Sequence, residues 1–380
     1  MSFTNLGLAP ALFDVLAEKQ YAKAYPIQQA AIPAILKGKD VLGIAATGSG
    51  KTASFVLPLL SNLQNNLVTK NRHVSVLVVV PTRELAVQVQ KVFQTFSSGL
   101  PQKVKSMAVY GGVSVNPQMI ALQGVNVLVA TPGRLLELVE SKAVHLSAVK
   151  TLVLDEADKM LNLGFKDEMN RIIALLPQKR QNLLFSATLN DDLDSITQVL
   201  LHQPEVIKIA PQKETPALIN QVAYFVQEEK KGPLLRYLLK NNGWQQVLVF
   251  ASSGFRADAI ADKLIKNGID AEAIHGKKSQ WVRTEALRQF KAGEIQVLVS
   301  TDLLARGIDI EFLPCVINYE LPRSPKDYIH RIGRTGRAES PGDAISLVTP
   351  DEEHHFKIIQ KKMGRMVERI ETEDLNLKGY

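Results

Sequence analysis

The strongest constraint on the fold of this 380-residue chain is a series of short apolar, β-branched runs, each followed by polar or glycine residues. The runs are Val41–Ile44, Val76–Val80, Val125–Ala130, Leu152–Leu154, Leu183–Phe185, Val247–Phe250 and Val297–Val299. Continuous apolar runs of this length are typical of strands buried on both faces, as in parallel sheets. Helical stretches lie between them; Leu85, Val89 and Phe96, for example, recur at the spacing of one helix face. Alternating strands and helices predict an α/β architecture.

The length favours two domains, because single cores seldom grow to this size. The periodicity breaks near 205–218, where Pro204, Pro211 and Pro216 stand among polar residues. We therefore expect a first domain over residues 1–205, a linker over 206–218, a second domain over 219–360 and a short polar tail over 361–380.

Composition narrows the class of protein. Hydrophobic residues make up 46% of the chain and charged residues 22%, which argues against extended disorder. No apolar stretch approaches the ~20 residues that span a bilayer, and the start lacks the pattern of a signal peptide, so we expect no membrane association. The single cysteine, Cys315, excludes an intramolecular disulfide and is expected to be a buried thiol in a reducing cytoplasm. The net charge of +7 favours polyanionic partners, although many basic proteins bind no nucleic acid.

Residues 45–52 read AATGSGKT and follow the first apolar run. Gly48 and Gly50 allow the backbone to wrap around a phosphate at the start of a helix. Lys51 is expected to reach the β- and γ-phosphates, and the Thr52 hydroxyl to bind Mg²⁺. Ala45 departs from the glycine of the general pattern, but a plain glycine turn is disfavoured because Gly-Lys-Thr follows a strand.

An acidic quartet follows the run Leu152–Leu154. Asp155 directly follows this strand, where P-loop enzymes carry the carboxylate that helps to bind Mg²⁺. Glu156 is a candidate to orient and deprotonate the attacking water. The alternative, a solvated acidic turn, is weakened by the buried strand that precedes it.

Two arginines far along the chain suit the same nucleotide. Arg334 and Arg337 lie three residues apart, so we expect them to project from one side of a helical turn. Guanidinium groups stabilise the charge that develops on a transferred γ-phosphoryl group. The alternative is a basic, solvated helix. A site divided in this way could couple ATP hydrolysis to movement.

Taken together, these motifs resemble those of the DEAD-box RNA helicases. The chain carries, in the family's order, PTRELA at 81–86, TPGR at 131–134, DEAD at 155–158, SAT at 186–188, ARGID at 305–309 and HRIGRTGR at 330–337. The resemblance runs from about Phe3 to about residue 360. It implies two RecA-like domains, each a mainly parallel sheet flanked by helices, with ATP and RNA in or across the cleft between them.

The resemblance also implies roles for single residues. The ATP contacts would be Phe3, Tyr21, Gln28, Thr47, Gly48, Ser49, Gly50, Lys51, Thr52, Gly307 and Asp309. Gln28 would recognise adenine, which supports ATP over GTP. Coupling of hydrolysis to strand separation would involve Asp158, Ser186, Thr188 and His330. The segment Ala24-Tyr25-Pro26-Ile27-Gln28 departs from the family's Pro-Thr-Pro-Ile-Gln, because Tyr25 is much bulkier than threonine.

RNA contacts are implied in both halves. In the first half they would be Pro81, Thr82, Arg83, Gly112, Thr131, Pro132, Gly133 and Arg134. In the second half they would be Gln280, Arg283, Thr301 and Asp302. Hydroxyls, glycine backbones and arginines suit contacts with the sugar–phosphate backbone and predict little sequence specificity.

We therefore expect an enzyme that hydrolyses ATP to ADP and phosphate when stimulated by RNA, and that locally separates short duplexes or remodels RNA–protein complexes. An ATP-gated RNA clamp or scaffold fits the same motifs, and a DNA translocase of the wider superfamily is disfavoured by the full motif set. The expected partners are ATP, Mg²⁺ and single-stranded or duplex RNA, with ribosomal or RNA-decay proteins as candidates. We expect a monomer with the compact core of a bacterial helicase, which a basic C-terminal extension could follow.

Overall fold

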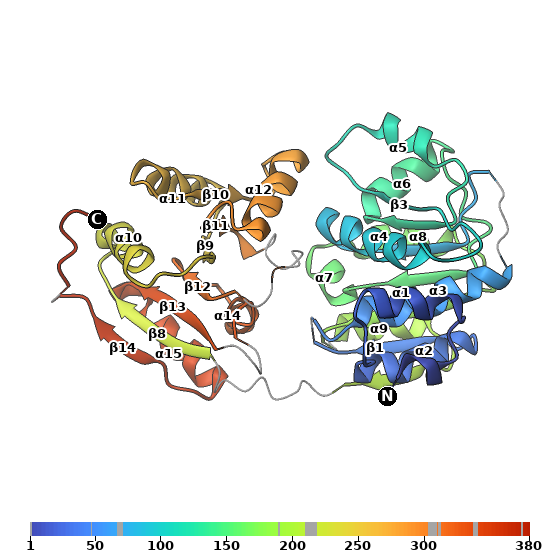
Figure 1. The fold of residues 1–380 in the computed structure, drawn as a ribbon, viewed down its shortest axis with the longest axis horizontal. Helices are drawn as coiled ribbons and strands as arrows, with labels where there is room; N and C mark the ends of the chain where they lie inside the picture. Colours follow the sequence, from blue (N-terminus) through green and yellow to red (C-terminus); the bar gives the residue numbers. More distant parts are fainter. Residues whose placement is uncertain are drawn as a thin grey trace. The chain divides into compact units, whose positions relative to one another are not determined.

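The structure is a computed structural model that describes residues 2–46, 48–66, 71–188, 191–209, 219–302, 310, 313–336, 341–373 and 375–380. The chain divides into two compact units, Met1–Gln212 and Lys213–Tyr380. Each unit is described by itself (Figure 1).

The described part of the first unit contains a parallel sheet of seven strands in the order β3-β4-β2-β5-β6-β1-β7. Its strands are β1 (Val41–Ile44), β2 (Val76–Val79), β3 (Ser106–Val109), β4 (Val127–Ala130), β5 (Thr151–Leu154), β6 (Gln181–Ser186) and β7 (Glu205–Lys208). Its helices are η1 (Phe3–Leu6), α1 (Ala11–Glu18), α2 (Pro26–Leu36), α3 (Lys51–Asn66), α4 (Arg83–Ser97), α5 (Val115–Ala121), α6 (Pro132–Glu140), α7 (Ala157–Asn162), α8 (Lys166–Ala174) and α9 (Asp191–Leu200).

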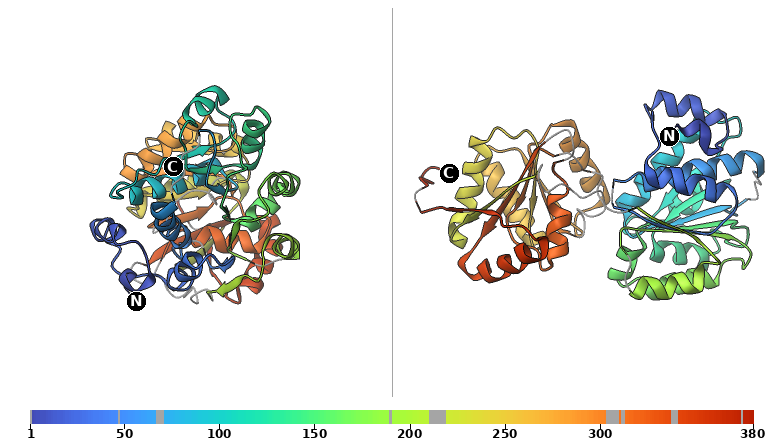
Figure 2. Two further views of the ribbon diagram at one scale, coloured as in Figure 1. Left: turned by 90° about the vertical axis from the view of Figure 1, so that its right-hand side faces the viewer. Right: turned by 90° about the horizontal axis from the view of Figure 1, so that it is seen from below.

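Alternate residues of the strands enter two separate cores, one on each face of this sheet. Val76 and Val78 of β2 join the core that includes buried side chains of α1 to α4. Leu77 and Val79 join the core with α6 to α9. Because both faces are covered, the strands read as continuous apolar runs, which is why they could be predicted. Figure 2 shows the helices on both faces of the sheet.

The described part of the second unit repeats this architecture, with seven parallel strands in the order β10-β11-β9-β12-β13-β8-β14. Its strands are β8 (Ile219–Phe225), β9 (Val247–Phe250), β10 (Ala271–Ile274), β11 (Val297–Ser300), β12 (Cys315–Asn318), β13 (Gly342–Val348) and β14 (Glu368–Glu371). Its helices are η3 (Glu228–Lys230), α10 (Lys231–Asn241), α11 (Gly254–Lys266), α12 (Gln280–Ala292), α14 (Pro325–Ile332), η4 (Pro350–Glu352) and α15 (Glu353–Met363). Helices α10 and α11 cover one face, while α12, α14 and α15 cover the other.

Two edge strands lie where the sequence predicts irregular chain. Strand β7 occupies part of the expected linker, and β14 lies within the expected tail. In β7 only Ile207 is buried, and β14 has no fully buried residue, so neither strand forms an apolar run. Charged side chains are typical of edge strands, where they discourage pairing with other chains.

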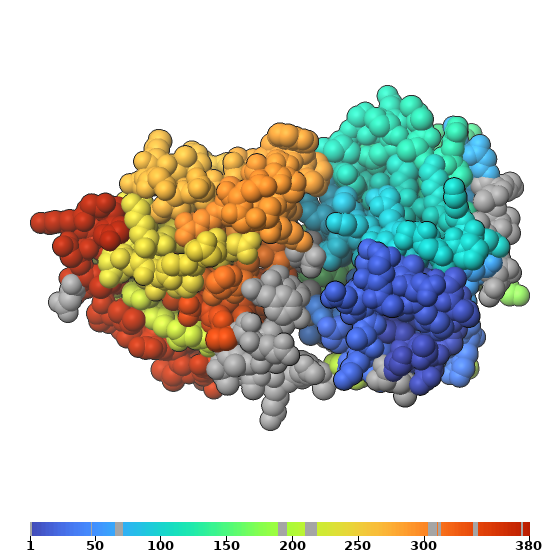
Figure 3. Space-filling model, viewed as in Figure 1, coloured from blue at the N-terminus to red at the C-terminus, as the bar shows by residue number. Residues whose placement is uncertain are grey.

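The last residues pack against the second unit. The rings of Tyr380 and Tyr237 meet edge to face at 5.2 Å, and the Asn241 side chain donates a hydrogen bond of 3.1 Å to the Tyr380 hydroxyl. Figure 3 shows this end of the chain, in red, beside α10, in yellow. The expected polar tail is therefore part of the folded unit.

Cys315 lies in β12 and is fully buried, as the sequence predicts. Burial raises the pKa of its thiol well above the ordinary value. Within the described chain, no helix is both long and apolar enough to cross a membrane.

Candidate functional site

In the first unit, most of the predicted site residues follow the carboxyl ends of strands, whereas Phe3, Tyr21 and Gln28 precede β1. Because the strands are parallel, these ends meet at one edge of the sheet, where open α/β sheets bind ligands. The strand order divides the edge into two parts. Neighbouring strands β3, β4 and β2 precede the expected RNA contacts, and neighbouring strands β5, β6 and β1 precede the expected phosphate and coupling residues.

The phosphate-binding loop joins β1 to α3. Gly48 and Gly50 have φ of 76° and 88°, in the left-handed region that favours glycine. Lys51 is the first residue of α3 and is buried; its Nζ donates to the carbonyl oxygens of Ala45 at 2.6 Å and Ala46 at 3.0 Å. The Ser49 hydroxyl is buried without a hydrogen-bond partner within the described chain, which suits a loop made for an oxygen-rich ligand. The expected contact Thr47 lies outside the described residues.

Gln28 ties helix α2 to this loop. Its Oε1 accepts a hydrogen bond of 2.9 Å from the backbone of Tyr25, and its Nε2 donates one of 3.1 Å to the carbonyl of Gly50. A Cβ at Gly50 would lie 2.5 Å from Nε2, so a side chain there would displace the Gln28 amide. A primary amide offers two donors and two acceptor lone pairs, so one donor and one acceptor remain for a nucleobase. Tyr25 makes this contact with its backbone N–H, so the bulkier side chain that replaces the family's threonine does not disturb the hydrogen bond to Gln28.

Tyr21, one of the expected ATP contacts, is held by two other aromatic rings. It packs edge to face on Phe96 at 5.2 Å and lies 6.3 Å from the ring of Phe3. Tyr21 keeps 37% of its surface exposed, whereas Phe3 belongs to the core. Phe3 is therefore placed to position Tyr21.

The acidic quartet follows β5 in a constrained turn. Glu156 has φ of 53°, which is uncommon for a residue other than glycine and marks a conformation imposed by its surroundings. Its backbone donates to Asp155 Oδ1 at 2.9 Å, and its Oε1 accepts from Lys159 Nζ at 2.6 Å. Within the described chain, Glu156 Oε2 and Asp158 Oδ1 are buried without hydrogen-bond partners.

Burial governs the titration of this cluster. It raises the pKa of Asp155 to about 7, with the neighbouring charge of Glu156 as the next cause. Burial also lowers the pKa of Lys51, against the attraction of the two carboxylates. Burial thus disfavours both the Asp155 carboxylate and the Lys51 ammonium. A bound cation would stabilise the carboxylate, and a bound phosphate would stabilise the ammonium.

The donor chemistry fits Mg²⁺. Among the described residues, no three His, Cys, Asp or Glu side chains gather as a metal site. Mg²⁺ is commonly held by one or two carboxylates together with substrate phosphates and water. Thr52, in the first turn of α3, and the buried carboxylate of Asp155 match this pattern.

The residues expected to couple hydrolysis to RNA are linked to the acidic quartet. Thr188 Oγ1 donates to Asp158 Oδ2 at 2.8 Å, and Ser186 Oγ donates to the Thr188 carbonyl at 2.8 Å. The Ser186 carbonyl accepts from the backbone of Ala45 at 3.1 Å. Contacts thus run from the phosphate-binding loop through β6 to Asp158.

The other part of the edge holds two arginines against glycine-containing loops. A Cβ at Gly112 would lie 2.1 Å from the nearest guanidinium nitrogen of Arg83. Arg134 Nη2 donates to the Val113 carbonyl at 2.7 Å, and its Nε pairs with Glu137 at 2.8 Å. Thr82, after the buried Pro81, caps α4, and Thr131 and Pro132 begin α6 ahead of Gly133.

Sequence reasoning missed Gln118, which fixes the loop after β3. Its side chain accepts a hydrogen bond of 3.0 Å from the Tyr110 backbone and donates one of 3.2 Å to the Tyr110 carbonyl. This double contact holds the chain just before Gly112. No sequence motif marks a lone glutamine for such a role.

In the second unit, Asp302 after β11 is partly exposed and forms an ion pair with the buried Arg331. Arg331 donates to both carboxylate oxygens of Asp302, at 2.5 Å and 2.8 Å, and to Asn318 Oδ1 at 3.0 Å. Arg331 is 2% exposed and lies over the ring of Phe250 at 4.7 Å. Asp302 thus fixes the strand-end loop that contains Thr301, and Arg331, which sequence reasoning did not select, is its anchor.

Gln280 and Arg283 lie together at the start of α12, where Ser279 caps the helix. Arg283 Nη2 donates to Gln280 Oε1, and both side chains are buried. Ser252 and Ser253, which the sequence shows shortly after the run Val247–Phe250, follow β9 at the same edge of the sheet, and Ser253 caps α11. Sequence reasoning assigned no site role to them.

Arg334 is not helical, contrary to expectation. Helix α14 carries His330 and ends at Ile332, and Arg334 lies in the turn that follows. The helix stops because the chain turns to bring Thr335 beside Leu313, whose backbone donates to the Arg334 carbonyl at 3.1 Å. Gly307, Asp309 and Arg337 lie outside the described residues.

Comparisons with known proteins agree with this arrangement. A family model described as DEAD/DEAH box helicase matches residues 25–196, and one described as helicase conserved C-terminal domain matches residues 229–339. The DEAD-box ATP-dependent RNA helicase CshA of Bacillus cereus is 39% identical over 376 residues, which are 99% of this chain and 70% of that relative. CshA of Streptococcus pneumoniae is 42% identical over 361 residues, or 95% of this chain and 68% of the relative. A solved structure of S. cerevisiae Dbp5 bound to RNA and ADP BeF3 is 30% identical with a TM-score of 0.84, covering 98% of this chain and 96% of that one.

Proposed function

The chain belongs to the DEAD-box ATP-dependent RNA helicases, and we propose that it couples RNA-stimulated ATP hydrolysis to local, sequence-independent unwinding of short RNA duplexes or to remodelling of RNA–protein complexes. One observation carries the proposal. In the first unit, the residues expected to bind phosphate follow β5, β6 and β1, and the residues expected to bind RNA follow the neighbouring strands β3, β4 and β2. A change in the bound nucleotide would therefore need to be transmitted only over a short distance to reach the RNA contacts.

The first unit would bind and activate the nucleotide. Lys51 exchanges its two loop carbonyls for phosphate oxygens, and Gln28 offers its remaining donor and acceptor to adenine. Thr52 and Asp155 would hold Mg²⁺, which would supply positive charge to the phosphates. Glu156 accepts the proton of the attacking water, with its carboxylate oriented by Lys159.

The second unit would supply Arg334 and Arg337 to stabilise the charge that develops on the γ-phosphoryl group. Asp158, Thr188, Ser186 and His330 would transmit the state of the nucleotide to the RNA contacts. Dbp5, the relative solved with RNA and ADP BeF3, supports a family mechanism in which both ligands bind together.

RNA would be held through its backbone. The proposed contacts in the first unit are guanidinium, hydroxyl and backbone groups around Arg83, Gly112 and Thr131, and in the second unit Gln280, Arg283 and the loop of Thr301. Such groups bind phosphates and 2′-hydroxyls without reading bases. We also propose that the protein acts in the cytoplasm as a monomer.

Gly112→Ala should weaken RNA binding more than a matched glycine substitution. An alanine Cβ would displace the Arg83 guanidinium, so the RNA concentration for half-maximal ATPase stimulation should rise about tenfold, equivalent to one lost charge-assisted contact. Gly124→Ala is the control, because Gly124 has a similar φ of 70° and a Cβ there would meet nothing within 4 Å. Both variants should lose about 1–2 kcal/mol of stability from left-handed strain. Equal RNA dependence in the two variants would remove Arg83 from the RNA site.

Strand displacement and RNA retention, measured side by side with ATP, test the proposed activity. We expect ATP-dependent release of a short RNA strand from its duplex and ATPase stimulation by RNA rather than DNA. The alternative is an ATP-gated RNA clamp, which the same sequence motifs fit. Slow RNA release without displacement would support the clamp and overturn the unwinding proposal.

A further inference from the structure

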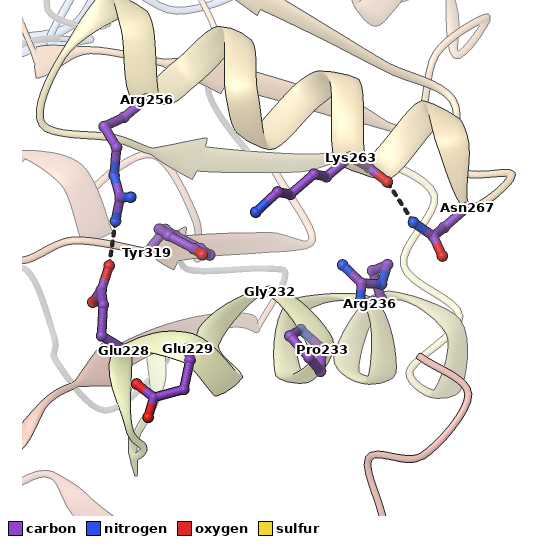
Figure 4. Close-up of a pocket in the computed structure, with 9 residues that line it drawn as sticks. All are labelled: Glu228, Glu229, Gly232, Pro233, Arg236, Arg256, Lys263, Asn267 and Tyr319. Atoms are coloured by element: carbon purple, nitrogen blue, oxygen red, sulfur yellow. Dashed lines mark hydrogen bonds and ion pairs between the residues drawn. The ribbon is translucent and has the colours of Figure 1, made fainter.

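The second unit contains a cavity of about 410 Å³ between α10 and α11 that none of the residues assigned above lines (Figure 4). Sites for small organic ligands typically measure about 300–1,000 Å³, so this volume suits a small metabolite. Its walls come from η3, α10, α11 and the residue that follows β12.

The charges around the cavity are unevenly compensated. Arg256 is neutralised, because its Nε pairs with Glu320 at 2.9 Å and its Nη2 pairs with Glu228. Among the described residues, Arg236 and Lys263 pair with no carboxylate, and Arg236 Nε is buried without a hydrogen-bond partner. Two cations are therefore left for an anionic ligand.

These groups converge from different elements. In Figure 4 the Lys263 side chain reaches from α11 and the Arg236 guanidinium rises from α10 into the space between the helices, where the Tyr319 hydroxyl also points. The Glu229 carboxylate points away from them. Burial raises the pKa of Tyr319 to about 12, so its hydroxyl remains a donor at neutral pH.

Gly232 keeps the space open. It lies in the first turn of α10, where glycine costs about 1 kcal/mol relative to alanine. A Cβ there would lie 3.5 Å from Arg236 Nη1 and 4.0 Å from the Tyr319 hydroxyl, so a larger side chain would enter the cavity. The amino-terminal end of α10 adds a partial positive charge to the same wall.

We propose that this cavity binds the phosphate group of a small phosphorylated metabolite, which Arg236, Lys263 and the Tyr319 hydroxyl hold between α10 and α11. A guanidinium and an ammonium form charge-assisted hydrogen bonds with phosphate oxygens, and the hydroxyl adds a neutral donor. The cavity exceeds the volume of one phosphate, which leaves room for a sugar-sized remainder.

Isothermal titration calorimetry of the full chain with ribose 5-phosphate tests this proposal, with ADP and Mg²⁺ saturating the nucleotide site. Ribose 5-phosphate should bind and ribose should not. Arg236→Gln and Lys263→Gln should each weaken binding by about tenfold or more, the effect of one lost charge-assisted contact. Lys266→Gln is the matched control, since it removes the same charge from the same helix outside the cavity and should leave binding unchanged.

Gly232→Leu supplies an independent arm, because it fills the cavity without removing a charge. It should abolish ribose 5-phosphate binding while thermal unfolding shows an intact fold. The proposal is overturned if neither ribose 5-phosphate nor inorganic phosphate binds at millimolar concentration, if Arg236→Gln binds ribose 5-phosphate with unchanged affinity, or if only a single-stranded oligouridylate binds in an Arg236-dependent way. The readout requires no ATP hydrolysis, so it stands apart from the test of unwinding.

Discussion

Arg334→Ala is expected to lower the turnover number for RNA-stimulated ATP hydrolysis by about 10³-fold or more, the range of an arginine finger. The guanidinium would act on the γ-phosphoryl group only as charge develops in the transition state, so the affinity for ATP should change little. A coupled-enzyme ATPase assay at saturating RNA gives the turnover number, and binding of a fluorescent nucleotide analogue gives the affinity.

Two further variants make this result interpretable. Arg323→Ala removes an exposed arginine from the same unit and should hydrolyse ATP at the normal rate. Arg334→Lys keeps the positive charge but lacks the planar guanidinium group with its several donors, so it should show only part of the original activity. Because Arg334 is 7% exposed and its carbonyl accepts from Leu313, thermal unfolding should accompany each assay. Wild-type hydrolysis by a folded Arg334→Ala protein would disprove the proposed role of the second unit.

Several strands that are buried on both faces could be predicted from their apolar runs, although β12, which is also buried throughout, was not among them. Strand β9 has the bounds that the apolar run Val247–Phe250 predicts, and β1 likewise matches Val41–Ile44. Edge strands β7 and β14 could not be found in this way, because charged residues break their apolar pattern and their pairing partners are distant in sequence. Tertiary pairing, rather than local propensity, makes them strands.

The site shows a similar limit. Lys51 and Asp155 could be predicted from motifs that follow strands, because the ends of parallel strands meet at one edge of the sheet independently of the conformation of the loops. The positioning contacts depend on side chains that meet only in the fold. Arg331 reaches Asp302 across 29 residues and Asn318 across 13, and Gln28 reaches the Gly50 carbonyl across 22. The end of α14 before Arg334 also depends on a distant partner, Leu313.

Glu156→Gln is expected to reduce ATP hydrolysis by about 10²–10⁴-fold, the usual contribution of a general base, while nucleotide binding persists. Glutamine keeps the shape of the side chain and can still accept from Lys159, but it cannot take the proton of the attacking water. Removing the Glu156 charge should also lower the pKa of Asp155, because that charge is one cause of its rise to about 7. The variant should therefore hold Mg²⁺ and ATP at least as well as the original protein.

The same substitution separates hydrolysis from RNA binding. If release of RNA follows hydrolysis, Glu156→Gln should retain single-stranded RNA far longer with ATP than the original protein does, as a labelled-RNA dissociation assay would measure. Glu168→Gln in α8 removes a carboxylate from the same unit outside the quartet, so its release rate should be unchanged. Suppose that a Glu156→Gln protein binds ATP without hydrolysing it and still releases RNA rapidly. RNA release would then depend on ATP binding and not on hydrolysis. In that case the contacts from Asp158 through Thr188 and Ser186 to Ala45 would stabilise the fold without coupling the two ligands.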